Sequence, residues 1–83
     1  MAKCILCIEV NDGNIVDALK KIEKFYPNHI WNGNMVKPTE YIPMYAECLY
    51  LFDDNTITYG SSLHKNECKI IITAEEFCNK TIK

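Results

Sequence analysis

Two short apolar runs that flank an acidic turn dominate the hydrophobic pattern of the chain. Within residues 45–60, β-branched, aromatic and aliphatic side chains lie on both sides of Asp53, Asp54 and Asn55. The flanking residue types fit the pleated, half-buried surface of a strand, whereas the three residues between them are turn formers. Asn55 is expected at positive φ, because Asn tolerates the left-handed region that the last position of a three-residue hairpin loop requires. The stretch therefore predicts a β-hairpin.

The same kind of pattern places a strand and a helix before this hairpin. Residues 4–10 are apolar apart from Glu9, which predicts a strand in the middle of a sheet. Apolar positions then recur at helical spacing through residues 15–26, with lysines and acidic residues on the opposite side. Asn14 is the expected N-cap, and Pro27 is expected to stop the helix because it cannot continue the hydrogen-bond ladder.

The remaining segments are shorter and more polar. Residues 28–43 contain Asn-Gly, which predicts either a short hairpin or an irregular loop, and residues 60–67 predict a mobile surface loop. Residues 69–73 predict a last strand, and Thr73 with Glu76 forms a capping box that opens a short helical turn.

These elements predict a single small α+β domain over residues 1–83. We expect a mostly antiparallel sheet of three to five strands, one long helix on one face, and a short C-terminal helical turn. Residues 45–52 carry large apolar groups on both faces of their strand, although the one long helix covers a single face. The Trp31 segment, the C-terminal turn or another protein chain is expected to cover the second face.

Composition supports a folded domain and argues against some partners. Apolar residues make up 48% and charged residues 24%, as in ordinary globular domains. The net charge is −2 and the nine basic residues are all Lys, so the bidentate phosphate and guanine contacts of Arg are missing and duplex nucleic acid is a poor default partner. With no apolar run near the ~18 residues of a membrane span and no secretory pattern, we expect a soluble cytoplasmic protein without membrane contact.

The five cysteines do not form a recognised motif. Cys4 and Cys7 match C-x-x-C, but inside a strand a separation of three residues is expected to send them to opposite faces. In a reducing cytosol, free cysteines are expected to behave as small buried hydrophobes. A zinc site made of Cys4, Cys7, His64 and Cys68 is conceivable, but the two closely spaced ligand pairs of a structural zinc are missing. We therefore predict no metal or cofactor.

No catalytic constellation emerges either. His29 and His64 are expected at the surface, since neither has a nearby nucleophile with an orienting third group. Asp53 and Asp54 are more simply turn residues than cation ligands. We expect a protein that is not an enzyme.

The aromatic residues are the best candidates for binding. Tyr and Trp dominate protein-binding hot spots, and the candidate anchors for a protein partner are Trp31, Tyr45, Tyr50 and Tyr59. The alternative is single-stranded RNA or nucleotide binding, in which aromatics stack on bases and lysines contact phosphates. The lysines that would serve it are Lys20, Lys21, Lys24 and Lys37. Self-association through edge strands is compatible with both.

Several short segments together resemble the small orphan proteins of tailed bacteriophages. The segments that carry this resemblance are Asp17-Ala18-Leu19, Trp31-Asn32-Gly33, Leu49-Tyr50-Leu51, Thr56-Ile57-Thr58-Tyr59-Gly60 and Ile72-Thr73-Ala74-Glu75-Glu76-Phe77. The resemblance implies an early phage protein that binds and inhibits or modulates a host or defence protein, such as a nuclease or the toxin of a toxin–antitoxin pair. It transfers no functional residues.

Overall fold

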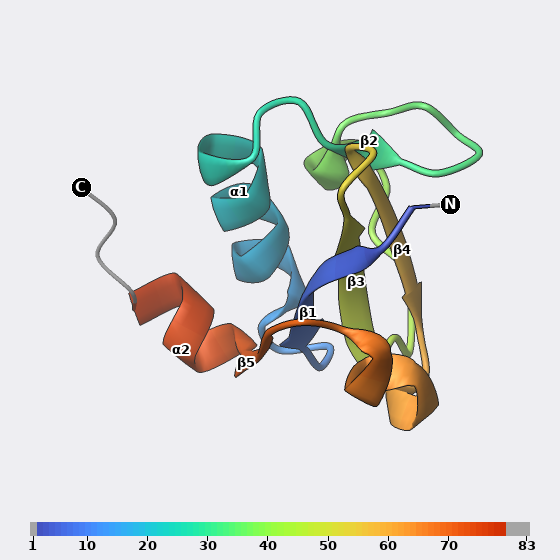
Figure 1. The fold of residues 1–83 in the computed structure, drawn as a ribbon. Helices are drawn as coiled ribbons and strands as arrows, with labels where there is room; N and C mark the ends of the chain where they lie inside the picture. Colours follow the sequence, from blue (N-terminus) through green and yellow to red (C-terminus); the bar gives the residue numbers. More distant parts are fainter. Residues whose placement is uncertain (1, 80–83) are drawn as a thin grey trace.

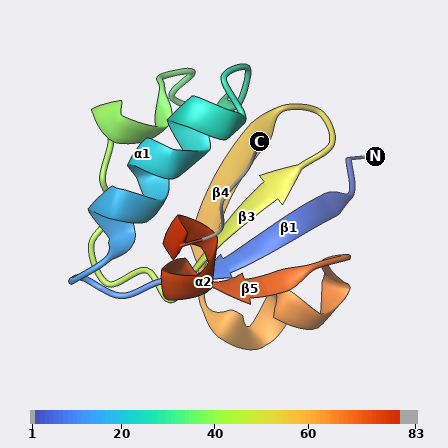
Figure 2. The same ribbon diagram turned by 90° about the vertical axis from the view of Figure 1, so that its left-hand side faces the viewer.

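The computed structural model describes residues 2–79, which form a five-stranded sheet with helices on one face (Figure 1, Figure 2). The strand order is β2-β4-β3-β1-β5. In chain order the elements are β1 (Cys4–Glu9), α1 (Ile15–Phe25), β2 (Ile30–Trp31), the 3₁₀ helix η1 (Pro38–Glu40), β3 (Cys48–Phe52), β4 (Thr56–Gly60), the 3₁₀ helix η2 (Ser62–Glu67), β5 (Ile71–Thr73) and α2 (Ala74–Asn79).

The α+β class and the single long helix are confirmed, but the sheet is mixed rather than mostly antiparallel. β3 pairs antiparallel with both β1 and β4, whereas β5 pairs parallel with β1 and β2 pairs parallel with β4. The reason is connectivity. A tight turn joins only β3 to β4, and the chain reaches β2 and β5 through helical crossovers that return it in the direction of β1. The β3–β4 hairpin is thus inserted between β1 and β2.

The predicted hairpin and its turn are present. Asn55 has φ 68°, as predicted, and Asp54 Oδ1 accepts a hydrogen bond from the Thr56 backbone N–H at 3.2 Å. The first strand begins at Cys48, however, and not at Tyr45. Tyr45 itself has φ 61°, which is outside the β region, so the strand does not extend back to this residue.

Helix α1 packs its apolar face on the sheet, but its N-terminus differs from the prediction. Ile15, Ala18, Leu19 and Ile22 are buried. Asn14 provides no side-chain cap, because its Oδ1 accepts a hydrogen bond from the Asn11 backbone N–H at 2.8 Å. The turn before the helix is therefore built from side-chain to backbone bonds of Asn11 and Asn14 rather than from a side-chain N-cap.

One main core lies between the sheet and the two helices. It joins α1, α2, the inner faces of β1, β3 and β4, and Trp31. Its buried members are Leu6, Ile8, Val10, Ile15, Ala18, Leu19, Ile22, Trp31, Ala46, Leu49, Leu51, Ile57, Ala74 and Phe77. Helix α2 thus belongs to the same face of the sheet as α1.

The predicted capping box of α2 is confirmed and gives a testable stability effect. Thr73 Oγ1 accepts the Glu76 backbone N–H at 3.1 Å, and Glu76 Oε1 accepts the Thr73 backbone N–H at 3.4 Å. Thr73→Ala is expected to lower the free energy of unfolding by about 1 kcal/mol, because it leaves a helix-terminal donor unpaired. Urea denaturation checks this, with Glu75→Ala on the exposed side of the same turn as the control. A Thr73→Ala midpoint equal to that control contradicts the expectation.

Two segments predicted as loops have more structure than expected. Residues 62–67 form η2, not a mobile loop, and Ser61 Oγ accepts the Leu63 backbone N–H at its start. In residues 28–43, the β2 strand is followed by a turn in which the Trp31 N–H donates to the Val36 carbonyl at 2.9 Å and Gly33 has φ 95°. This closure resembles the predicted hairpin turn, but no second strand follows it.

Candidate functional site

The second face of the sheet carries a separate small cluster of sulfur and aromatic side chains. Cys7, Cys48 and Tyr50 are buried there, and partly buried Cys4, Phe52 and Cys68 pack against them. Cys4 and Cys7 therefore share a face, contrary to the prediction. The cause is an irregularity in the β1–β3 register between Cys4 and Leu6, because a bulge shifts the alternation by one residue.

Cys4 and Cys68 form a disulfide, so the expectation that these two cysteines are free is wrong. The zinc set that was conceivable from the sequence is also not assembled, since two of its four ligands are joined by this bond. Among residues 2–79, no group of three or more His, Cys, Asp and Glu side chains is placed to hold a metal ion. Cys7, Cys48 and Cys78 remain as thiols.

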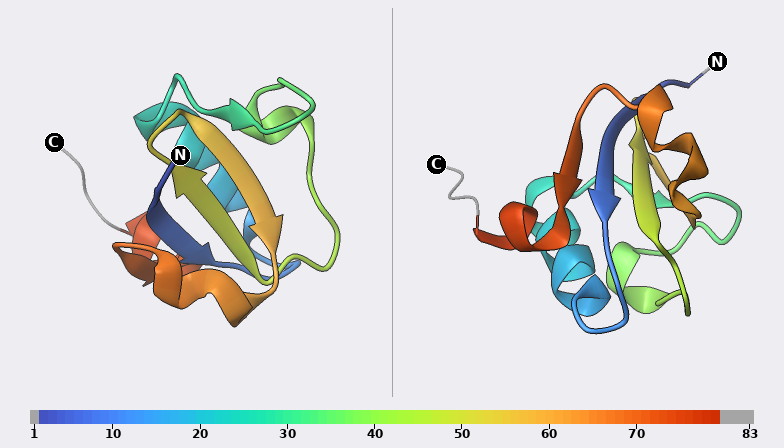
Figure 3. Two further views of the ribbon diagram at one scale, coloured as in Figure 1. Left: turned by 45° about the vertical axis from the view of Figure 1, so that its right-hand side comes forward. Right: turned by 90° about the horizontal axis from the view of Figure 1, so that it is seen from below.

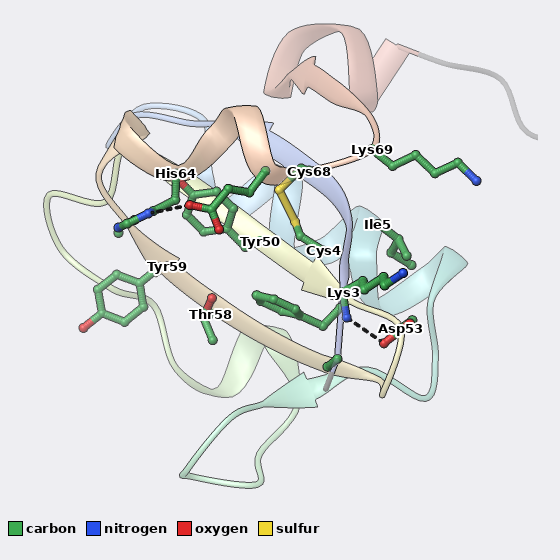
Figure 4. Close-up of a pocket in the computed structure, with 14 residues that line it drawn as sticks. Lys3, Cys4, Ile5, Tyr50, Asp53, Thr58, Tyr59, His64, Cys68 and Lys69 are labelled. Carbon is green, nitrogen blue, oxygen red and sulfur yellow. Dashed lines mark hydrogen bonds and ion pairs between the residues drawn. A yellow bond between two sulfur atoms is a disulfide. The ribbon is translucent and has the colours of Figure 1, made fainter.

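A hollow of about 830 Å³ lies on this second face (Figure 4). Tyr50, Phe52 and the disulfide contribute apolar lining, and β4 contributes Thr58. Its polar rim includes His64, whose Nδ1 lies 3.1 Å from Glu67 Oε2, and Asp53, whose Oδ1 accepts the Lys3 backbone N–H at 3.0 Å. The list of lining residues is Ala2, Lys3, Cys4, Ile5, Tyr50, Phe52, Asp53, Thr58, Tyr59, Gly60, His64, Glu67, Cys68 and Lys69.

The segment that covers part of the second face is η2, which was not among the expected candidates. In Figure 1, η2 lies on the side of the sheet away from α1 and α2. The Tyr50 hydroxyl donates to the Ser61 carbonyl, and burial is the main cause that raises the pKa of Tyr50. The Trp31 segment and the C-terminal helix belong to the main core on the other face.

Two of the four predicted protein-binding anchors are buried. Trp31 is 2% exposed and its Nε1 donates to the Pro38 carbonyl at 3.0 Å. Tyr50 is 6% exposed. In contrast, Tyr45 is 80% and Tyr59 is 44% exposed. The alternation of side-chain direction along a strand does not predict which of these tyrosines is exposed, because exposure depends on which segments pack over each face of the sheet.

Tyr59 belongs to an aromatic cluster with Trp31 and Tyr41. Both tyrosine rings meet the indole edge to face, with centroids 5.7 Å (Tyr41) and 5.8 Å (Tyr59) from it. The two hydroxyls lie 3.3 Å apart, and this hydrogen bond is the main cause that raises the pKa of Tyr41. The cluster fixes the start of the segment that leads from η1 to β3.

That segment exposes four large apolar side chains within five residues. Tyr41, Ile42, Met44 and Tyr45 are all exposed, with Met44 at 73%, whereas Pro43 between them is fully buried. We call residues 41–45 the apolar knuckle. Between η1 and β3 the chain swings out beyond β4 (Figure 3). The prediction named only Tyr45 of this set, although the run of large apolar residues on both sides of Pro43 was visible in the sequence.

The knuckle contains a strained backbone position. Tyr45 has φ 61°, a region that bulky residues adopt rarely and at a cost of about 1 kcal/mol or more. Such strain persists only where the surroundings over-determine it, and the flanking chain supplies this. Pro43 and Ala46 are buried on either side, and the Glu47 N–H donates to the Gly60 carbonyl at 3.1 Å. The tyrosine ring is thus held outward by a fixed backbone.

The four predicted RNA-binding lysines are divided between two elements. Lys20, Lys21 and Lys24 lie on α1, and Lys37 precedes η1. The ammonium groups of Lys21 and Lys24 lie 5.1 and 5.5 Å from the Phe25 ring centroid. None of the exposed tyrosines comes from α1. RNA binding by these lysines stays a prediction.

The two histidines differ in their exposure to solvent. His64 is exposed, as expected, but His29 is 6% exposed, so its surface assignment is wrong. The His29 ring packs edge to face with Tyr26, and its Nε2 lies 2.9 Å from the Phe52 carbonyl oxygen. His29 thereby joins the chain after α1 to the end of β3, which is a structural role.

Comparisons with protein-family models, with curated proteins and with solved structures found no match. None of the helices within residues 2–79 is both long and apolar enough to cross a membrane. The two surfaces with features that suit binding are the apolar knuckle and the second face of the sheet.

Proposed function

We propose that this protein is a non-enzymatic binding protein that inhibits or modulates another protein, with the apolar knuckle as its contact surface. The observation that carries the proposal is the exposure of Tyr41, Ile42, Met44 and Tyr45 within one five-residue segment. Burying such side chains against a partner removes apolar area from water, the main favourable contribution to protein association. Tyr59 adjoins the knuckle through Tyr41 and extends it.

The knuckle suits recognition because it is preorganised. Pro43 is buried, and the Tyr41 ring packs on Trp31. A segment held in its bound conformation loses less conformational entropy on association, so more of the contact energy appears as affinity. The partner class comes from the resemblance to phage orphan proteins, which points to a host or defence protein such as a nuclease or toxin.

Tyr45→Asn is the sharpest test of this proposal. It removes the ring, while Asn tolerates the left-handed backbone, so the fold is expected to stay intact. The matched control is Leu63→Ser, which removes an 82% exposed apolar side chain from η2. Wild type and both variants serve as bait in bacterial lysate, retained proteins are quantified by mass spectrometry, and the Kd of a purified partner is then measured.

A partner retained by wild type and Leu63→Ser is expected to be lost by Tyr45→Asn. Loss of an interface tyrosine costs about 2 kcal/mol, or a roughly thirty-fold weaker Kd. Recovery of general chaperones alone, or of proteins that Tyr45→Asn retains equally well, argues against the proposal.

A further inference from the structure

We propose that the Cys4–Cys68 disulfide is a redox-sensitive crosslink that holds η2 over the second face of the sheet. Reduction of this disulfide is proposed to expose that face. Residues 61–68, called the strap below, comprise Ser61, η2 and Cys68. The inference concerns a different surface from the apolar knuckle and does not depend on the proposed function.

The strap has little apolar packing of its own. None of its η2 residues is buried, and Leu63 in its middle is 82% exposed. A segment with few buried apolar contacts opens at low free-energy cost unless another link holds it. Within residues 2–79, the disulfide is the only side-chain crosslink between the strap and β1.

The non-covalent links of the strap are few and close to solvent. Lys65 Nζ lies 3.0 Å from Glu9 Oε2, with both side chains more than a third exposed, and such pairs contribute little. The Ser62 N–H donates to Glu47 Oε1 at 2.9 Å, also at an exposed position. The Tyr50 hydroxyl bond to the Ser61 carbonyl and the Lys65–Glu9 bond are partly buried. Directly after the strap, the Lys69 N–H donates to the Cys4 carbonyl at 3.2 Å. The disulfide adds a covalent crosslink to these contacts.

What lies beneath and beside the strap is a set of buried groups. Cys7 and Cys48 are completely buried and Tyr50 nearly so, in the cluster against which Cys4 and Cys68 pack. Burial, with the Cys48 thiol beside it, raises the pKa of the Cys7 thiol to about 12. At neutral pH Cys7 is thus a thiol and not the nucleophilic thiolate, so it does not attack the neighbouring disulfide. The bond persists until an external reductant arrives.

An external dithiol reaches the bond through the hollow, since Cys4 and Cys68 line it (Figure 4). A reductant of the thioredoxin class supplies two electrons and two protons. Its thiolate attacks one sulfur, the Cys4–Cys68 bond breaks, and a mixed disulfide forms. Its second thiol resolves that intermediate, leaving Cys4 and Cys68 as thiols and the reductant as a disulfide. The strap then keeps its polar contacts, two of them partly buried, but loses its crosslink to β1.

Thiol labelling of the folded wild-type protein tests the proposal. Oxidised and dithiothreitol-reduced samples are pulsed with iodoacetamide, and each cysteine is quantified by peptide mass spectrometry. Cys78 on α2 is the internal reference, because its half-buried thiol is remote from the disulfide in sequence and lies on the other side of the sheet. Reduction is expected to raise the labelling rates of Cys7 and Cys48 at least about tenfold relative to Cys78.

Local opening must be separated from unfolding of the whole domain. Labelling is therefore repeated at increasing sub-denaturing urea, with far-UV circular dichroism in parallel. Local release of the strap exposes little surface, so the rate should depend weakly on urea while the spectrum stays native. Unchanged labelling of Cys7 and Cys48 on reduction overturns the proposal. So does labelling that rises only with loss of the native spectrum or with the urea dependence of global unfolding.

Discussion

Replacing Cys4 and Cys68 together by Ser is expected to lower the free energy of unfolding by about 2–4 kcal/mol. The two residues are 64 apart in sequence, and in the chain-entropy model a crosslink over such a loop removes much of the freedom of the unfolded chain. For a domain of this size, the midpoint of thermal unfolding is expected to fall by roughly 10–25 °C.

Thermal and urea denaturation under non-reducing conditions measure this effect. The matched control is Cys78→Ser, which removes a thiol that takes no part in the disulfide and is expected to change the midpoint little. Reduced wild type and the double Ser variant should unfold at similar midpoints, because both lack the same crosslink. A double variant as stable as the oxidised wild type would show that the crosslink does not restrict the unfolded chain.

Trp31→Ala is expected to destabilise the protein by about 3–5 kcal/mol, a large part of the roughly 4–12 kcal/mol typical of a domain this size. The indole is 2% exposed and belongs to the main core, so its removal leaves a cavity in that core. Trp31→Phe keeps part of the ring volume but leaves the Pro38 carbonyl without its donor, at an expected cost of about 1–3 kcal/mol.

Far-UV circular dichroism in urea is the appropriate measurement, because Trp31 is the sole tryptophan and its loss removes the fluorescence signal. The control is Tyr45→Asn, whose ring is 80% exposed, and its free energy of unfolding is expected to stay within about 0.5 kcal/mol of wild type. A Trp31→Ala variant that matches this control would contradict the assignment of Trp31 to the core.

These two aromatics show where sequence-based inference of the site fails. Trp31 and Tyr45 are both large aromatics in or next to segments with turn signals, and both are plausible anchors on residue type alone. Their roles differ because Trp31 lies in β2, which pairs with β4, and meets the rings of Tyr41 and Tyr59 edge to face. The backbone of Tyr45 instead turns its side chain out. Neither contact is local in sequence.

The cysteines are a second example of residues whose contacts the local sequence does not predict. Alternation in a regular strand separates Cys4 from Cys7, but the bulge after Cys4 places both on the second face. The disulfide partner of Cys4 lies 64 residues away, and five cysteines do not specify their pairing by sequence spacing. Cys68 lies next to Cys4 because β5 pairs parallel with β1, which places residues 68–71 beside the start of β1.

The sequence by itself determined the local elements: the β3–β4 hairpin with Asn55 at positive φ, the amphipathic α1 helix, and the capping box of α2. These depend on side-chain periodicity and on turn and cap chemistry, which act over a few residues. Only the tertiary structure decided the parallel edges of the sheet, the burial of Trp31 and Tyr50, the exposure of the apolar knuckle, and the fastening of η2 by a disulfide. Each of these depends on which distant segments pack together, and crossover connections and burial on a two-sided sheet are not encoded in local residue preferences.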